Sequence, residues 1–517
     1  MAESQDWSSG ESEPDVPSQN VNDFDYVNLH NTDYNAYQIF KNAKFHPSIK
    51  QFDGIFNINS SIEITGNRPL DYFGYFFDSS IFQLIIDETN CYAGQHNETE
   101  SSHMKSWSPV TKEDLEIFFG LSILMGNIRK GNLKDYWSTD PLLHTPIFSQ
   151  MMPRDRYMQI LRFLHFHNNL EIVDHPLIKI KPVIDDLQRK FATALIPGKT
   201  LCIDESLLLW KGKLRFKQYI SLKRNRFGIK IFELVDCETG FILGFVVYTG
   251  ANTAFEKFGL GFTGDIVAHF LQPYFDKGHV VYIDNWYTSP ILAEFLYRHN
   301  TGLCGTVKAN RKGMPKLENK LLRGEVQAAH NNIWMAIKWE DKRSVRMLTT
   351  VHDLDFCVTG KKDYQTNEDI LKPTCVHDYN QNMGGVDYID RQLSITETVR
   401  KSMKWYKKLF FHLLDLCMSN AHALYKIKNS EHMPYPKFRL QIARSLLKMD
   451  SNHSISYNVS CPTRLVGRHF PKIDTSRRCH LCSVRKITRR TKYICSSCNL
   501  PLCINPCFQE YHTHEKL

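Results

Sequence analysis

The chain has 517 residues, of which 42% are hydrophobic, and it carries a formal net charge of +9. A chain of this length can bury substantial cores and is expected to form several domains. No apolar run approaches the length that spans a bilayer, and the acidic N-terminus lacks the basic-then-apolar pattern of a signal peptide. Both features argue against a membrane protein and a secreted protein, and the positive charge is mild evidence for a polyanionic partner.

The N-terminal segment, residues 1–24, is acidic and rich in serine. Such a composition cannot bury enough apolar surface to fold, so the segment is predicted to be disordered and is most simply a solubilising tail. From residue 25 to 198 the pattern is mostly helical. Thr111 to Asp114 has the spacing of a capping box ahead of an apolar stripe, which predicts a helix there, and a second helix is predicted over 154–166.

Residues 199–308 change to short apolar runs that alternate with helical patterns. Strands are predicted over 200–209, 229–237, 241–248, 279–283 and 303–307, and helices over 265–275 and from Pro290 onward. This order, β-β-β-α-β-α-β, predicts an α/β core with a mixed sheet covered by helices, and it is the order of the ribonuclease H-like fold.

The remaining segments are less regular. Residues 309–375 are polar and β-leaning, which is typical of an inserted β-rich domain. Residues 376–396 return to a helical pattern, and a long helix is predicted over 399–428, within a segment that extends from 397 to 450. Residues 451–475 are interpreted as a linker.

Three aspartates lie at positions in predicted strands and helices that are typical of metal ligands. Asp204 interrupts an otherwise apolar strand, Asp284 follows the short strand 279–283, and Asp387 opens a helix with Asp390 one turn later. Because neighbouring parallel strands bring their carboxyl ends to one crevice, the first two carboxylates are expected to be neighbours. Two such carboxylates repel one another unless a cation neutralises them, and oxygen ligands with open positions suit Mg²⁺ or Mn²⁺. Alternatively, these acids are strand-end and helix-cap residues with structural roles.

The motifs around these acids resemble those of a known family. Ile203-Asp-Glu205, Asp284-Asn-Trp-Tyr-Thr-Ser289 and Gly384-Gly-Val-Asp387 are similar to the three acidic motifs of piggyBac transposases, and the resemblance extends from about residue 105 to the C-terminus. Phe227 to Lys230, Gly305 to Lys308 and Tyr379-Asn also match. The resemblance implies that Asp204, Asp284 and Asp387 are catalytic and hold two Mg²⁺ or Mn²⁺ ions, with Asp390 a further acid beside them.

The resemblance also implies the reaction and the partners. A piggyBac transposase cuts each transposon end in double-stranded DNA, forms hairpins on those ends and joins them into a TTAA target. It would act in the nucleus as a homodimer on terminal inverted repeats. Residues 199–308 and 376–396 would form the catalytic domain, and 25–198 and 397–450 a dimerisation and DNA-binding domain. The resemblance implies DNA contacts by Lys308, Arg311 and Trp405. Arg400, Lys401 and Lys404 form a basic stretch beside Trp405 that suits an unpaired base. Alternatively, Trp405 is a core aromatic residue.

The last segment, residues 476–517, carries regularly spaced metal-ligand residues. Its eight candidate ligands are Cys479, Cys482, Cys495, Cys498, Cys503, Cys507, His512 and His514. Because four ligands satisfy one Zn²⁺, eight predict two zinc ions in a cross-brace. Cys479, Cys482, Cys503 and Cys507 would bind one ion, and Cys495, Cys498, His512 and His514 the other. The segment resembles the cysteine-rich terminal domain of piggyBac transposases.

The sequence also has three other interpretations, of which the first is disfavoured. Gly259 to Gly264 fits the dinucleotide-binding fingerprint, with Asp284 twenty residues on, but a polar loop separates it from the preceding strand, so a nucleotide cofactor is not expected. A RING-like ubiquitin ligase would explain the cysteines and leave the aspartates unexplained. A domesticated, non-catalytic DNA-binding protein of the same fold would retain every motif named above.

Overall fold

The computed structural model describes residues 38–40, 45–96, 107–171, 173–221, 226–317, 320–362, 364, 367–398, 402–429, 433–449 and 468–514. The predicted acidic tail and much of the predicted linker lie outside these residues. The chain divides into two compact units. One comprises 1–62 and 191–390, and the other comprises 63–190 and 391–517. Among the described residues, no helix is both long and apolar enough to cross a membrane.

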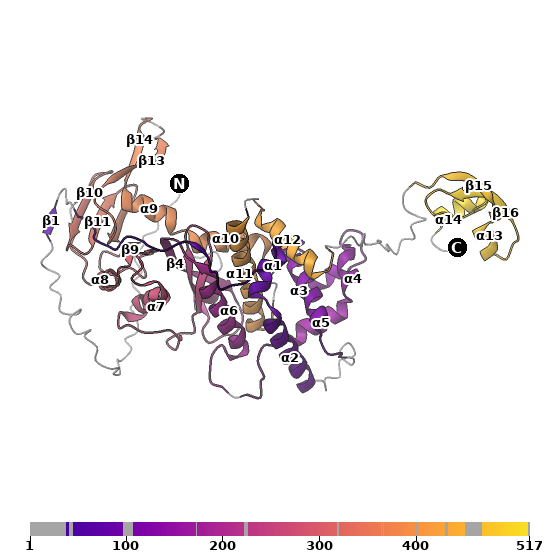
Figure 1. The fold of residues 1–517 in the computed structure, drawn as a ribbon, viewed down its shortest axis with the longest axis horizontal. Coiled ribbons are helices and arrows are strands. Elements are labelled where there is room, and N and C mark those ends of the chain that lie inside the picture. Colours follow the sequence, from indigo (N-terminus) through magenta and orange to yellow (C-terminus); the bar gives the residue numbers. More distant parts are fainter. Residues whose placement is uncertain are drawn as a thin grey trace. The chain divides into compact units, whose positions relative to one another are not determined.

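The first unit is built on a ten-stranded mixed sheet (Figure 1). Its central strands are β4 (Thr200–Leu209), β6 (Phe227–Asp236), β7 (Ile242–Val247), β8 (Val280–Ile283) and β9 (Gly302–Thr306). β6 lies between β4 and β7 and is antiparallel to both, whereas β4, β8 and β9 are parallel neighbours. A short strand, β5 (Gln218–Tyr219), also pairs with β6. All four residues of β8 are buried, as expected for a strand between two covered faces.

Two helices connect these strands. α7 (Gly261–Leu271) joins β7 to β8, and α8 (Pro290–Arg298) joins β8 to β9. The sequence-based expectation of a mixed sheet with helices is therefore confirmed. α7 begins four residues earlier than predicted because the glycine-rich loop before it is fixed by the side chain of Asp265, which accepts the backbone N–H groups of Phe258 and Leu260, both at 2.9 Å.

The described part of residues 309–375 contains five strands, and the first three continue the main sheet. β10 (Val326–His330), β11 (Met335–Glu340) and β12 (Ser344–Thr349) are antiparallel, and β12 pairs with β9. β1 (Gln38–Phe40) pairs with β10. β13 (Phe356–Lys362) and β14 (Asp369–Pro373) form a two-stranded sheet of their own, and β2 (Asn57–Ile58) pairs with β3 (Leu195–Ile196).

The chain then returns to the central strands through two helices, α9 (Thr374–Asn382) and α10 (Gly385–Thr396). α9 contacts β4, β9 and β12. These helices therefore bring the third acidic motif back to strands that lie about 180 residues earlier in the sequence.

Apart from its C-terminal segment, the described part of the second unit is helical. Its helices are α1 (Pro69–Phe76), α2 (Ser79–Gln95), α3 (Lys112–Asn127), α4 (Pro146–Met151), α5 (Arg154–Phe163), most of α6 (Lys181–Ala194), α11 (Trp405–Lys428) and α12 (Tyr435–Leu446). α3 begins at the predicted capping box, in which the N–H of Asp114 donates to the Thr111 hydroxyl and the N–H of Thr111 donates to the Asp114 carboxylate. The predicted long helix is α11, which begins at Trp405 rather than at 399.

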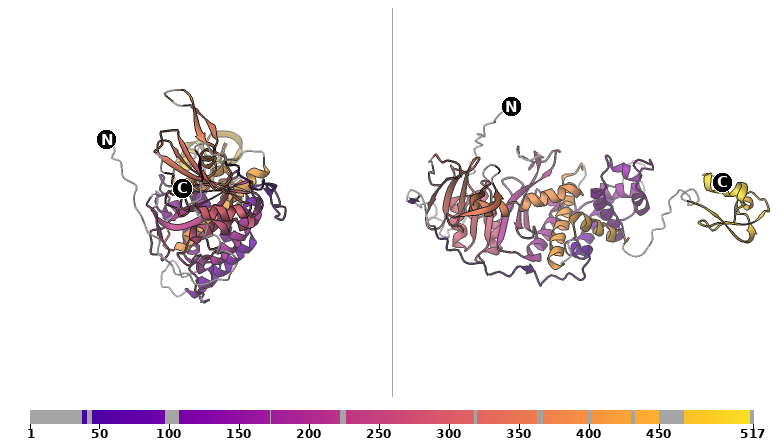
Figure 2. Two further views of the ribbon diagram at one scale, coloured as in Figure 1. Left: turned by 90° about the vertical axis from the view of Figure 1, so that its left-hand side faces the viewer. Right: turned by 90° about the horizontal axis from the view of Figure 1, so that it is seen from above.

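The C-terminal segment has a small fold of its own, drawn in yellow in Figure 2. β15 (Pro471–Arg478) and β16 (Arg490–Cys495) form an antiparallel pair, and α13 (His480–Val484) and α14 (Gln509–Thr513) complete the segment. Its core consists of Leu481 and Leu502 together with four buried cysteines. So small an apolar core provides little folding free energy on its own.

Candidate functional site

Asp204 and Asp284 emerge side by side from two parallel strands. Ile203 of β4 is paired with Ile283 of β8, so the next residue on each strand is an aspartate. β8 ends there, whereas β4 continues to Leu209. Each carboxylate is oriented by a local hydrogen bond: Asp204 accepts the N–H of Glu205 and Asp284 accepts the N–H of Trp286, both at 2.9 Å. The two acids therefore occupy the same edge of the sheet.

The third acidic motif lies over the face of β4 that carries Asp204. Because side chains alternate along a strand, Cys202, Asp204 and Ser206 share this face. A Cβ atom on Gly385, at the start of α10, would lie 2.5 Å from the Cys202 sulfur, so only glycine permits this approach. The Ser206 hydroxyl donates to Asp390 on the same helix, at 2.6 Å.

Asp387 lies in the first turn of α10, between these two contacts along the helix. The fold thus brings Asp204, Asp284, Asp387 and Asp390 into one region of the first unit. In the part of the chain that the structure describes, the three predicted metal-binding aspartates do not form a group whose ligand atoms all lie within 4.8 Å of one another.

The electrostatics of this region favour cation binding. Burial raises the pKa of Asp284, its hydrogen bond from Trp286 opposes that shift, and the negative charge of Glu205 adds to it. A carboxylate that is costly to ionise in isolation is stabilised when a cation is placed beside it. The acid pair can therefore hold a hard divalent cation, for which carboxylate oxygens are the preferred ligands.

The basic residues expected to contact DNA have different environments. Lys308 is exposed just after β9. The Arg311 guanidinium instead donates to the backbone carbonyls of Asn285 and Trp286, at 2.6 and 2.8 Å, so it holds the loop that follows Asp284. Arg400 and Lys401 lie outside the described residues.

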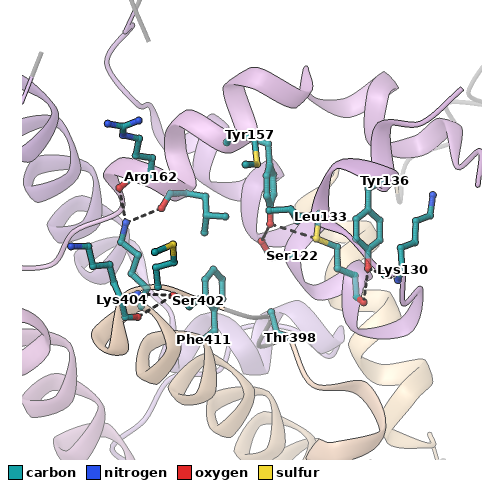
Figure 3. A pocket seen from close by; sticks show the side chains of 16 residues that line it. Ser122, Lys130, Leu133, Tyr136, Tyr157, Arg162, Thr398, Ser402, Lys404 and Phe411 are labelled. Carbon is teal, nitrogen blue, oxygen red and sulfur yellow. Dashed lines mark hydrogen bonds between the residues drawn. The ribbon is translucent and has the colours of Figure 1, made fainter. Parts of the chain in front are cut away.

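Lys404 and Trp405 stand at the beginning of α11, where Lys404 is exposed and Trp405 is half-buried. Lys404 also lines a cavity of about 470 Å³ in the helical unit, together with Lys130 and Arg162 (Figure 3). Lys407, one turn into α11, donates to the carbonyls of Leu161 and Arg162 at the end of α5. These hydrogen bonds make Lys407 a C-terminal cap of α5, although burial lowers the pKa of its ammonium group to about 7.

The C-terminal segment gathers two groups of four metal-ligand side chains. Cys479, Cys482, Cys503 and Cys507 form one group, in the expected combination, and all four are buried. The Cys482 and Cys507 sulfurs lie 3.5 Å apart, and the Cys479 sulfur accepts the N–H of Cys503. Four thiols converging in this way fit the donor set of a structural zinc ion.

The second group differs from the expectation in one residue. Cys495, Cys498 and His512 are joined by His469, and His514 lies elsewhere. The His469 Nδ1 atom is 3.4 Å from the sulfurs of both Cys495 and Cys498. His512 Nε2 is 3.5 Å from the Cys498 sulfur, while its Nδ1 atom is 2.6 Å from the Phe508 carbonyl. Such a carbonyl contact fixes the ring orientation of a metal-binding histidine.

The spacing of residues in the sequence does not identify His469 as a ligand. This histidine lies ten residues before Cys479, the first of the predicted ligands, and no second ligand residue accompanies it at a recognisable spacing. Pairing of β15 with β16 brings it into place, since Pro471 is opposite Cys495 and the N–H of Ser496 donates to the Phe470 carbonyl. His514 is exposed, and its ring lies near the Glu510 carbonyl and the Thr513 hydroxyl. A predicted hairpin that began near residue 470 would have pointed to His469.

Comparisons with known proteins agree with this architecture. A family model described as Transposase IS4 matches residues 68–422, and one described as DDE_Tnp_1-like zinc finger matches residues 467–513. Human PiggyBac transposable element-derived protein 2 is 25% identical over 472 residues, which cover 86% of this chain and 76% of that protein. Human PiggyBac transposable element-derived protein 3 is 24% identical, with the same coverage of both chains.

A solved structure shows the same fold. The cryo-EM structure of a piggyBac transposase synaptic complex with hairpin DNA matches 88% of this chain and all of that chain, with a TM-score of 0.69 and 21% sequence identity. The match of one family model to more than half of the sequence, together with this fold, leads to one conclusion: the chain belongs to the piggyBac-type transposase family.

Proposed function

We propose that this chain is an active DNA transposase that cleaves and rejoins DNA strands with divalent metal ions held by Asp204, Asp284 and Asp387. The observation that carries the proposal is the placement of Asp204 and Asp284 at neighbouring parallel strand positions, with α10 packed across the Asp204 face. The order of the central strands and the antiparallel direction of β6 support a ribonuclease H-like core.

The ligand chemistry supports Mg²⁺ or Mn²⁺ at this site. Held by Asp204, Asp284 and Asp387, two such ions would activate the attacking oxygen and stabilise the leaving oxygen of a phosphodiester. Three carboxylates carry a charge of −3, so a site with two divalent ions stays positive and attracts the DNA backbone. The hydrogen bond from Ser206 to Asp390 anchors α10, the helix that carries Asp387 in its first turn, to β4.

The proposed substrate is double-stranded DNA that ends in the inverted repeats of the transposon. The chain would cut each end, pass through a hairpin intermediate and join the ends into a TTAA target, working as a homodimer in the nucleus. The family, together with the related synaptic complex that contains hairpin DNA, supports this sequence of events. Lys308, Arg311, Arg400, Lys401, Lys404 and Trp405 are the proposed DNA contacts.

We further propose that the C-terminal segment binds two zinc ions through the two groups of four side chains described above. Zinc would supply the folding free energy that its small core does not. Nine lysines and arginines lie between residues 468 and 492, so the folded segment would present positive charge to DNA phosphates.

The central test is strand cleavage by the purified, zinc-loaded chain. Its substrate would be DNA taken from the genomic sequences that flank the reading frame. Cleavage should require added Mg²⁺ or Mn²⁺. Asp204→Asn should abolish cleavage while a gel-shift assay still detects DNA binding, whereas Asp369→Asn, at an exposed position of β14, should leave both intact. Cleavage by the Asp204→Asn protein at the wild-type rate would refute the assignment.

A second function, that of a non-catalytic DNA-binding protein, is suggested by the relatives, whose names describe them as transposable element-derived. An excision assay separates the two functions. A plasmid carrying the flanking repeats would be excised by an active transposase, and it would be bound but left uncut by a non-catalytic protein.

A further inference from the structure

Lys230 is a lysine of β6 whose side chain lies beside the acidic site. In the pairing of β4 with β6, Glu205 is opposite Phe232 and Leu207 is opposite Lys230, so all four side chains share one face. This is the face opposite the one that carries Asp204. The Lys230 side chain is only 12% exposed. A largely buried ammonium group is costly unless it has partners.

Its partners are one carboxylate and two aromatic rings. The Lys230 ammonium is 3.6 Å from the Glu205 carboxylate. It also lies 4.0 Å from the centre of the Trp286 ring and 4.7 Å from that of Phe232, within the range of cation–π attraction. The two rings are nearly parallel, at an angle of 14°. Burial lowers the pKa of Lys230, and the negative charges of Glu205, Asp284 and Asp204 counteract this shift.

These contacts connect the two segments that carry the aspartates. Glu205 is the residue after Asp204, and Trp286 belongs to the loop after Asp284. A hydrogen bond also connects these two segments, because the hydroxyl of the buried Tyr287 donates to the Glu205 carboxylate at 3.1 Å. The backbone N–H of Trp286, in turn, donates to Asp284 at 2.9 Å. Lys230 thus contacts both Trp286, which packs against β6, and Glu205 of β4. Through Trp286 it holds the loop whose backbone orients Asp284.

We propose that Lys230 is a positioning residue of the active site. It connects the loop after Asp284 to the strand that carries Asp204, and its ammonium group places a positive charge beside the carboxylates of the site. The proposal rests on the function proposed above. Asp204, Glu205, Asp284 and Asp387 together carry −4 when ionised, and Lys230 reduces this charge to −3. One divalent ion then leaves a charge of −1, and a second makes the site positive.

Removing this charge has two opposite consequences. Without Lys230 the four carboxylates keep their full −4 charge, so a divalent cation should bind more tightly. For a unit charge and a divalent ion roughly 7 Å apart in a water-like medium, Coulomb's law gives a change in Kd of about tenfold. The Asp284 loop also loses its connection to β4 through Lys230, although the Tyr287–Glu205 hydrogen bond remains. Misplacement of a catalytic group by about 1 Å slows a reaction roughly 100-fold. Tighter metal binding combined with slower cleavage is the signature of this role.

The test compares Lys230→Met and Lys230→Arg with the wild type in zinc-loaded, full-length protein. Mn²⁺ binding without DNA would be followed by the electron paramagnetic resonance signal of free Mn²⁺. We expect Lys230→Met to bind Mn²⁺ about tenfold more tightly and to cleave flanking-repeat DNA roughly 10- to 100-fold more slowly. Lys230→Arg keeps the charge and the ring contacts, so it should restore wild-type Mn²⁺ affinity. Lys361→Met, at an exposed position of β13, is the matched control and should change neither quantity.

Two results would overturn the inference. One is wild-type Mn²⁺ affinity in a folded Lys230→Met protein, which would show that the charge does not act on the metal site. The other is an equal loss of cleavage and of thermal stability in Lys230→Met and Lys230→Arg. This result would show that Lys230 contributes only to packing and that its charge has no role in cleavage. An Asp204→Asn arm tests the underlying function separately: unchanged Mn²⁺ binding there would refute the metal site itself, whatever the Lys230 variants do.

Discussion

The buried ion pair between Arg439 and Asp415 gives the sharpest stability prediction. Both side chains are fully buried, and the guanidinium donates to the carboxylate at 2.6 Å. The Thr398 hydroxyl donates to the same carboxylate at 2.6 Å and accepts from Arg439 at 2.7 Å. The pair therefore joins α11, α12 and the segment that follows α10. Arg439→Met would leave the Asp415 carboxylate buried without its main cationic partner.

The expected cost is large. Removing one partner of a buried ion pair costs about 3–5 kcal/mol, because the remaining charge stays desolvated. For folding units of this size, each kcal/mol lowers the melting temperature by about 2–4 °C, so the shift should be on the order of 10 °C. Scanning calorimetry is the appropriate assay, because it can resolve separate transitions in a chain of two compact units.

Two further variants control this experiment. Lys181→Met removes one partner of an exposed pair with Asp185 and should cost no more than about 0.5 kcal/mol. Arg439→Met combined with Asp415→Leu removes both buried charges and should recover much of the loss, since apolar replacement of a whole buried pair is often close to neutral. A shift below about 2 °C for Arg439→Met, or a double variant less stable than the single one, would refute the reasoning.

Two other predictions concern zinc and packing. His469→Ala should lower the zinc content measured by mass spectrometry from two ions toward one per chain, whereas His514→Ala should leave two; the reverse pattern would restore the sequence-based assignment. Gly126→Ala should destabilise the helical unit by about 1–3 kcal/mol, because its new methyl group would overlap the Thr396 carbonyl. Gly74→Ala, in α1 with no atom near the added methyl, should instead stabilise it by about 0.5–1 kcal/mol, and equal melting temperatures of the two variants would contradict this account.

Local patterns in the sequence predicted much of the central sheet. β4, β6, β7, β8 and β9 were expected in the right order because each is a short apolar run bounded by turn residues, a signal that depends only on neighbours in the chain. The start of α3 was equally predictable, since a capping box satisfies its own backbone groups. Helix boundaries were less accurate: α7 begins early because Asp265 bonds to the loop before it.

The sequence alone also identified the acids and the cysteines, because a strand-end carboxylate and a repeated Cys-x₂-Cys spacing are visible without long-range contacts. Only the tertiary structure decided which other residues join them. His469 enters the second metal-ligand group through strand pairing, Arg311 holds the Asp284 loop, and Lys230 lies beside Glu205 across two strands. These partners are selected by strand register and loop closure. Such contacts form only when segments that are distant in the sequence fold together, so the spacing of residues along the chain does not predict them.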